Sequence, residues 1–178
     1  YLKTPDTECI LIDAIYHKDF RNELFWKIKT NAELTTSSGK LKFEAGKILM
    51  QLDLKKEAIQ SEVLKAEQSN TSVIYNDQFF FKIYRKLDVD INPDLELVRF
   101  LSDRTDFGNS PRYGGGIQLE DLSSTSFTIL GLLQNKIPNQ GEAWEVMLAS
   151  VIHFYENTLQ NGKEQMAFPE LIRKKHLS

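Results

Sequence analysis

The spacing of apolar residues along the first third of the chain separates a helix from a strand. After Asp19, a residue suited to helix N-capping, apolar side chains recur every four positions, at Phe20, Leu24 and Ile28. Residues 40–45 instead alternate charged and apolar side chains, which predicts a half-buried strand. The apolar run 9–16 follows neither period, so it is compatible with a strand or with a buried helical turn.

Residues 57–86 predict a three-stranded antiparallel meander. Segments 58–67, 71–75 and 78–86 are rich in strand-forming residues, and Asn76-Asp77 separates the last two. Asn and Asp both tolerate positive φ, which a two-residue hairpin requires.

The second half of the chain adds two helices and two strands. Asn92 is a good N-cap, Pro93 suits the first helical position, and Asp94 and Glu96 place acids in the first turn. Two strands are expected at 113–120 and 126–134, and a long helix at 142–161 with Trp144, Met147, Val151 and Phe154 on one side. The order predicts an α+β fold with a mostly antiparallel sheet of about five strands.

Composition narrows the classes of function. The chain has 178 residues and a net charge of -3, which argues against a nucleic-acid partner. A single cysteine fits a reducing compartment, and we expect a cytoplasmic protein. Because no apolar run approaches the ~18 residues of a membrane span, no membrane partner is expected.

Lys82 is the first candidate for chemistry. It stands in a strand of Phe79, Phe80, Phe81, Ile83 and Tyr84, where an ammonium is costly unless an anion meets it. The structural interpretation is an edge-strand lysine that discourages pairing with another sheet. The functional interpretation is a cation that holds a phosphate together with an acidic partner.

Glu96, on the following helix, is the expected partner. A lysine on a strand and a glutamate on the next helix form the pair that protein-kinase-type enzymes use to hold the α- and β-phosphates. The polar segment 68–72 could cover phosphates with hydroxyls and backbone N–H groups. The three glycines 114–116 do not open a helix, so we interpret them as a flexible turn into a strand. Neither a zinc-binding motif nor a nucleophile elbow occurs in the sequence.

The segment 66–101, AEQSNTSVIYNDQFFFKIYRKLDVDINPDLELVRFL, resembles the bacterial maltokinase family, including forms fused to trehalose synthase. In that family E-Q-S-N-T-S leads into a hairpin, a strand with K-x-[FY]-R-[RK], and then I-N-P-D-[LI]-E. Weaker matches lie at 11–28 and 130–144.

The resemblance implies an aminoglycoside-phosphotransferase-like kinase that transfers the ATP γ-phosphate to maltose with Mg²⁺, for α-glucan synthesis. It gives Lys82 the role of the phosphate-gripping lysine and Glu96 that of its helix partner. It places Ser69, Asn70, Thr71 and Ser72 over the phosphates, and residues 130–137 beside adenine. It also implies three parts: a cap-side segment (1–56), the N-lobe sheet with its helix (57–136), and a linker with the first C-lobe helix (137–178).

The family's H-G-D-x-H-type catalytic loop and its metal-binding aspartate have no match in this sequence. We therefore expect the N-lobe portion of a longer polypeptide, truncated at both ends, inactive alone and prone to self-association. The expected partners are maltose or a related sugar, the C-lobe of the same polypeptide and a trehalose synthase. A non-catalytic interaction module, or a kinase for another sugar or an aminoglycoside, remains an open alternative.

Overall fold

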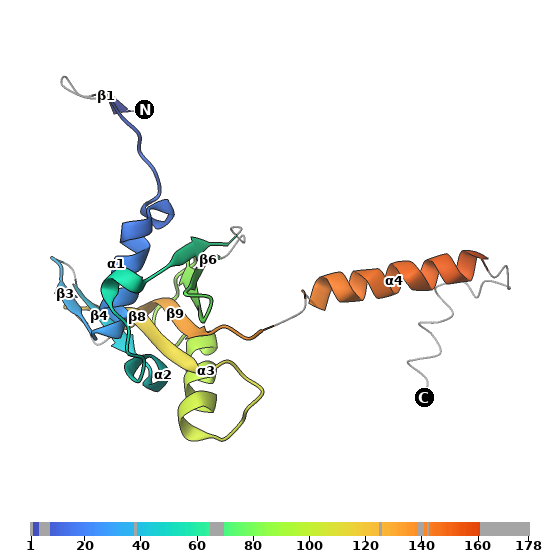
Figure 1. Ribbon diagram of the computed structural model, residues 1–178. Helices are drawn as coiled ribbons and strands as arrows, with labels where there is room; N and C mark the ends of the chain where they lie inside the picture. Colours follow the sequence, from blue (N-terminus) through green and yellow to red (C-terminus); the bar gives the residue numbers. More distant parts are fainter. Residues whose placement is uncertain are drawn as a thin grey trace. The chain divides into compact units, whose positions relative to one another are not determined.

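The computed structural model describes residues 2–3, 8–37, 39–64, 70–124, 126–138, 141 and 143–160. The chain divides into two compact units, Tyr1–Ile137 and Pro138–Ser178 (Figure 1). The described part of the first unit is an α+β structure built on one large antiparallel sheet, and that of the second is dominated by the helix α4 (Ala143–Gln160).

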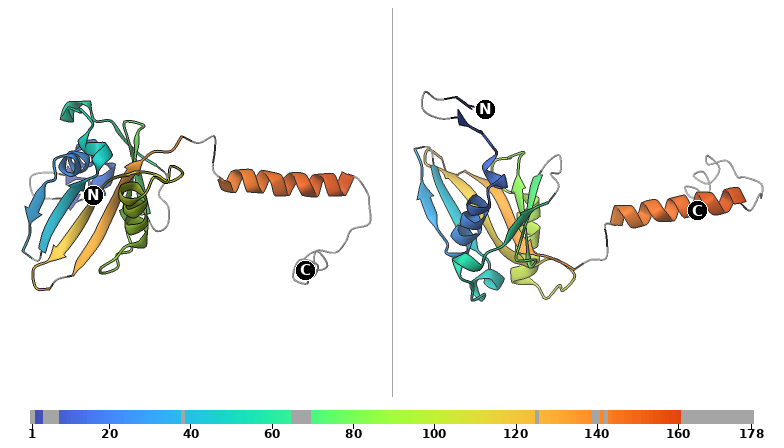
Figure 2. Two further views of the ribbon diagram at one scale, coloured as in Figure 1. Left: turned by 90° about the horizontal axis from the view of Figure 1, so that it is seen from below. Right: turned by 45° about the horizontal axis from the view of Figure 1, so that its top comes forward.

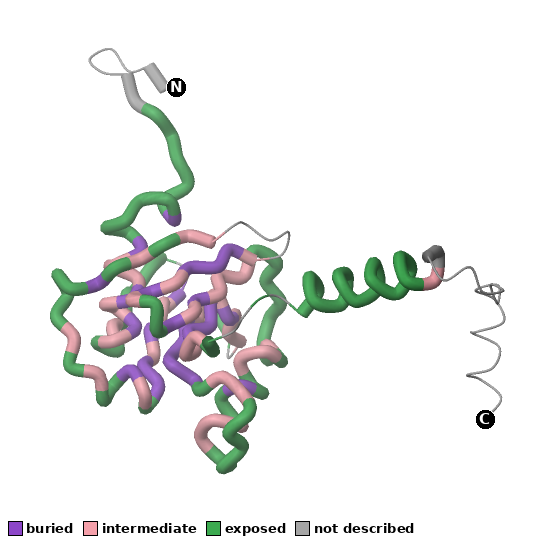
Figure 3. The backbone as a smooth tube through the Cα atoms, turned by 45° about the vertical axis from the view of Figure 1, so that its right-hand side comes forward, coloured by how far each residue is buried: buried purple, intermediate pink, exposed green. Residues whose placement is uncertain are grey.

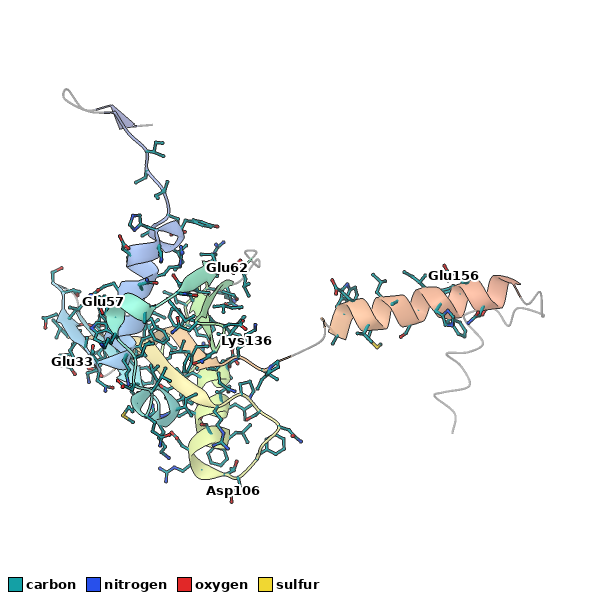
Figure 4. All side chains as sticks on the ribbon, viewed as in Figure 1. Glu33, Glu57, Glu62, Asp106, Lys136 and Glu156 are labelled. Atoms are coloured by element: carbon teal, nitrogen blue, oxygen red, sulfur yellow. The ribbon has the colours of Figure 1, made fainter. Side chains whose placement is uncertain are left out.

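The large sheet has seven strands in the order β3-β4-β8-β9-β7-β6-β5, and every neighbouring pair is antiparallel. The strands are β3 (Glu33–Thr35), β4 (Gly39–Ala45), β5 (Ser61–Val63), β6 (Asn70–Tyr75), β7 (Phe79–Tyr84), β8 (Tyr113–Asp121) and β9 (Phe127–Asn135). A separate two-stranded sheet pairs β1 (Leu2–Lys3) with β2 (Glu8–Cys9). Side chains of Glu33 and Glu62 mark the two edge strands of the large sheet (Figure 4).

The α+β class is confirmed, but the predicted number of about five strands is wrong. The structure extends the sheet on its β8 side with β4 and β3. β3 is only three residues long and each of its residues is exposed, so it carries no alternation of burial from which it could be predicted. The predicted meander is confirmed as β5-β6-β7, with Asn76 and Asp77 both at positive φ in the hairpin.

One face of the sheet is covered by α1 (Lys18–Lys29). Phe25 and Ile28 of this helix are fully buried and belong to the main core, together with Phe43, Val73 and Phe81 of the sheet. The predicted helix is therefore confirmed, although it begins one residue before Asp19 and His17 occupies the N-cap. The same unit also contains a short helix and two 3-10 turns: α2 (Lys47–Met50), η1 (Ala14–Tyr16) and η2 (Lys56–Ala58).

The opposite face of the sheet is covered by α3 (Pro93–Arg104), as the two views in Figure 2 illustrate. Val98 is buried and Leu95 half-buried against Tyr84, Tyr113 and Leu132 in a second, smaller core. The predicted cap is confirmed because Asn92 Oδ1 accepts the N–H of Leu95 at 3.1 Å. The two faces of the sheet are called the α1 face and the α3 face below, after the helix that covers each.

The three glycines 114–116 lie inside β8 and are buried, so their interpretation as a flexible turn is wrong. A Cβ at Gly115 would meet the carbonyl oxygen of Glu44 and lie 2.5 Å from Cγ2 of Ile28. Glycine is therefore required here for the close approach of β4 and α1 to the strand.

Apolar residues near the start of the chain and along α4 are exposed (Figure 3). Ile10, Leu11 and Ile12 are 66%, 80% and 55% exposed and belong to no helix or strand. The run 9–16 ends in the 3-10 turn η1 with Ile15 buried, so the helical-turn alternative holds for its last residues. Within the described residues, no helix is both long and apolar enough to span a membrane.

Candidate functional site

Lys82 lies in β7, inside the sheet between β6 and β9, with its side chain on the α3 face. Its strand neighbours Phe81 and Ile83 point to the α1 face, because side chains alternate along a strand. Since β7 has a partner on each side, the interpretation of Lys82 as an edge-strand lysine is wrong. Its side chain is 27% exposed.

The acidic partner of Lys82 is Asp94, in the first turn of α3. Lys82 Nζ lies 2.8 Å from Asp94 Oδ2, and the Tyr84 hydroxyl donates to the same oxygen at 3.1 Å. Lys82 and Tyr84 reach one carboxylate because residues two apart on a strand share a face. Burial, and then the negative charge of Asp94, raises the pKa of Tyr84, so the phenol stays a neutral donor.

Glu96 does not pair with Lys82, which corrects the expected ion pair. Its side chain is exposed and makes no hydrogen bond or ion pair within the described part of the chain. It lines a groove of about 410 Å³ between α3 and the β8-β9 pair, together with Phe100 and Gln118. Residues two apart on a helix differ by about 200° around its axis, so Asp94 and Glu96 face different surroundings.

The polar segment expected over the phosphates is partly strand. Ser69 lies outside the described residues, while Asn70, Thr71 and Ser72 form the start of β6. Ser72 is directly opposite Lys82 in the pairing register and Asn70 is opposite Tyr84, so both lie on the α3 face. Thr71 points to the α1 face, where its Oγ1 accepts from Arg85 Nε at 2.9 Å.

Beside Lys82, two half-buried apolar residues continue the same face toward the hairpin end of the sheet. Ile74 and Phe80 are paired in the register, and Phe80 lies two residues before Lys82. Phe80 is also paired with Gln134 of β9, within the segment 130–137 that was expected beside adenine. Two apolar side chains, Ile74 and Phe80, thus lie on the same face of the sheet as the Lys82 ammonium.

Arg99 forms a second charged cluster on the α3 face. Its guanidinium donates to Oε1 and Oε2 of Glu44 at 2.5 and 3.1 Å and lies 5.4 Å from the centre of the Tyr113 ring. This pair ties α3 to β4 and so holds the helix whose first turn carries Asp94.

Asp94 and Tyr84 are the site residues that the sequence reasoning did not assign. The signal for both was present: Tyr84 shares the strand face of Lys82, and Asp94 occupies the first turn of the next helix. No protein-family model matches the chain. Within the described residues, no group of three or more His, Cys, Asp or Glu side chains is arranged to hold a metal ion.

Proposed function

We propose that this chain supplies the nucleotide-binding lobe of an ATP-dependent sugar kinase, with maltose as the acceptor. The observation that carries the proposal is the ion pair between Lys82, on an interior strand, and Asp94, on the helix that follows. Protein-kinase-type enzymes position the phosphates of ATP with a lysine on a strand held by an acid on the next helix.

The order of elements supports the same proposal. The lysine strand β7 leads into the acidic helix α3 and then into β8 and β9, and β9 returns to pair with β7. Lys82 is thus supported from both sides by paired strands, which limits its movement. A cation that must hold a flexible polyphosphate benefits from such a rigid base.

The residues around Lys82 fit a nucleotide. The ammonium binds phosphate oxygens, and Asp94 keeps it oriented through Oδ2, the oxygen that also accepts the Tyr84 hydroxyl. Ile74 and Phe80 offer an apolar surface for a purine ring on the same face. Because Asp94 takes the position expected of Glu96, the proposal now assigns Asp94, not Glu96, to hold the lysine.

Phosphoryl transfer also needs Mg²⁺ and a base that accepts the proton of the sugar hydroxyl. We assign neither to a described residue. The role of this chain in the proposal is to bind and orient the nucleotide, in a cytoplasmic enzyme of α-glucan metabolism whose C-lobe contributes the remaining groups.

The test is maltose-dependent ATP turnover by the complete gene product carrying Lys82→Ala. Loss of a positioned cation should lower turnover about 100-fold or more. The matched control is Lys18→Ala, which removes an exposed lysine in α1 and should leave turnover within about twofold. Turnover of the Lys82 variant equal to that of the control would reject the proposed role of the lysine, and a wild-type protein that phosphorylates no sugar would reject the kinase.

A further inference from the structure

A second cavity, of about 280 Å³, lies on the α1 face, on the other side of the sheet from Lys82. We call it the α1 pocket. Its walls are almost entirely apolar and include Leu24 of α1 and Phe43, Ile83, Ile117 and Leu130 of the sheet. Apolar pockets with a few placed polar groups are the usual sites for small molecules.

The pocket exists because α1 covers the sheet unevenly. Phe25 and Ile28, in the second half of the helix, are fully buried, whereas Leu24 is half-buried and Phe20 is 42% exposed. Ile83 and Leu130 of the sheet are likewise only half-buried below this end of the helix. The apolar surface here is therefore incompletely covered by the described part of the chain.

Arg85 lines the pocket with a guanidinium that is oriented by a hydrogen bond. Its Nε donates to the hydroxyl of Thr71 at 2.9 Å, and Thr71 is 3% exposed. This bond fixes one edge of the guanidinium and leaves the Nη1–Nη2 edge, which can donate two parallel hydrogen bonds to a carboxylate. Within the described residues, no acidic side chain forms an ion pair with Arg85.

Asp13 is the other charged residue that lines the pocket. Its Oδ1 accepts the N–H of Ile15 at 3.1 Å and caps η1, so this carboxylate already has a partner in the backbone. Asp13 and Arg85 form no ion pair with each other. The Arg85 guanidinium is the charged donor at the pocket, whereas Asp13 can only accept hydrogen bonds and so does not bind a carboxylate.

We propose that the α1 pocket binds a medium-chain monocarboxylate, with the alkyl chain between α1 and the sheet and the carboxylate on the Nη1–Nη2 edge of Arg85. The apolar wall suits an alkyl chain, and the oriented guanidinium of Arg85 suits a negatively charged head group. A neutral alcohol or an alkylammonium ion could use the wall but could not form the charge-assisted bonds with the guanidinium. The proposal does not depend on the kinase, because Lys82 and Asp94 lie on the opposite face.

The test is calorimetric titration of the chain with hexanoate, octanoate and decanoate below their micellar concentrations. Affinity should rise by about fourfold for each added CH₂ until the pocket is full, since burial of one CH₂ contributes ~0.8 kcal/mol. Decanol should bind at least about tenfold more weakly than decanoate, because it cannot accept the two charge-assisted hydrogen bonds. Absence of decanoate binding to the wild-type chain overturns the proposal.

Three variants separate this site from nonspecific binding. Arg85→Gln should lower decanoate affinity about tenfold and leave decanol unchanged, while Arg112→Gln, at an exposed arginine outside the pocket, should change neither. Leu130→Phe, which adds volume to the wall, should weaken decanoate more than hexanoate. Equal decanoate affinity in the wild type and Arg85→Gln overturns the proposal.

Leu11, 80% exposed and two residues before Asp13, is the alternative occupant from the chain itself. Binding of decanoate only to Leu11→Ser, and not to the wild type, would assign the pocket to that side chain and likewise overturn the proposal. Thermal melts of each variant identify any that fail to fold, and Arg85→Lys then provides a milder test of the same contact.

Discussion

Lys82 and Asp94 are 12 residues apart in the chain and form an ion pair across the interface between β7 and α3. The pair is partly open to solvent, since the two side chains are 27% and 41% exposed. An exposed pair of this kind contributes at most about 1 kcal/mol to stability. The pair therefore contributes little to folding, and in the proposed function its role is to position Lys82.

The first prediction compares the two acids of the first turn of α3. Asp94→Asn removes the charge that holds Lys82, so we expect the complete protein to lose at least about tenfold in maltose-dependent ATP turnover. Glu96→Gln changes an exposed carboxylate without a described partner and should leave turnover within about twofold. A larger loss from Glu96→Gln than from Asp94→Asn would contradict the assignment of Asp94.

The second prediction concerns the Tyr84 hydroxyl. Tyr84→Phe removes one donor to Asp94 and should lower the free energy of unfolding by about 1 kcal/mol at neutral pH, measured by urea denaturation. The pKa of Tyr84 is raised in the folded state, so the stability it contributes is complete below the unfolded value of about 10 and is lost as pH rises through the folded pKa.

An absorbance titration at alkaline pH checks the same point. Wild-type protein should contain one more late-ionising tyrosine than Tyr84→Phe. Identical alkaline titrations of wild type and Tyr84→Phe would show that the hydroxyl is not shielded.

Local sequence patterns predicted much of the fold because local chemistry decides these elements. The cap at Asn92, the hairpin at Asn76-Asp77 and the alternation in β4 each depend on residues that are neighbours in the chain. The period of apolar residues predicted the helix that begins at Lys18, although Phe25 and Ile28 are the residues buried in the main core and Phe20 is exposed. Phe20 lies toward the helix end that leaves the α1 pocket open.

The misassigned features depend on contacts between distant segments. Whether Asp94 or Glu96 meets Lys82 is set by the rotation of α3 about its axis, and that rotation is fixed by Leu95 and Val98 packing on the sheet. The sequence alone suggests a turn at Gly115, because the contacts that require glycine there come from β4 and α1, which are distant in the chain. The strand β3 depends on its partner β4, since its own residues are all exposed.

The third prediction tests the glycine in β8. Gly115→Ala adds a Cβ against Glu44 and Ile28 at a φ of +152°, so we expect a loss of about 3 kcal/mol or more in the free energy of unfolding. Gly108→Ala is the control, because no atom lies within 4 Å of the added Cβ, and its effect should stay within about 0.5 kcal/mol. Equal denaturation midpoints for the two variants would contradict the required close approach.

The fourth prediction tests Arg21, an 8% exposed arginine of α1 that holds β5 to the helix. Its guanidinium donates to the Ile15 carbonyl at 2.9 Å and to Oγ and the carbonyl of Ser61 at 3.0 and 3.1 Å. Arg21→Lys keeps the charge but cannot form this fork, so we expect a loss of about 2 kcal/mol in the free energy of unfolding.

Arg112→Lys, at an exposed arginine, is the control for Arg21→Lys and should cost less than about 0.5 kcal/mol. Arg21→Lys and Ser61→Ala should also be non-additive by at least about 0.5 kcal/mol in a double-mutant cycle, because they remove a shared bond. Additive effects would mean that the helix and the edge strand are held together by other contacts.

The fifth prediction is a pH dependence centred on Glu23. Hydrogen bonds from Lys56 first and Lys27 second lower the pKa of this carboxyl, with Nζ–Oε distances of 2.5 and 3.1 Å. A lowered pKa means that the contribution to stability is complete above the unfolded value of about 4.3 and is lost as pH falls through the folded pKa.

Glu23→Gln should therefore be less stable than wild type near neutral pH and equally stable in acid, once the wild-type carboxyl is also protonated. Because the Glu23 side chain is 39% exposed, the difference should be only a few tenths of a kcal/mol and should shrink at high salt. Urea denaturation of both proteins across this pH range measures it, and a difference that persists unchanged in acid would assign the effect to packing of the side chain and not to its charge.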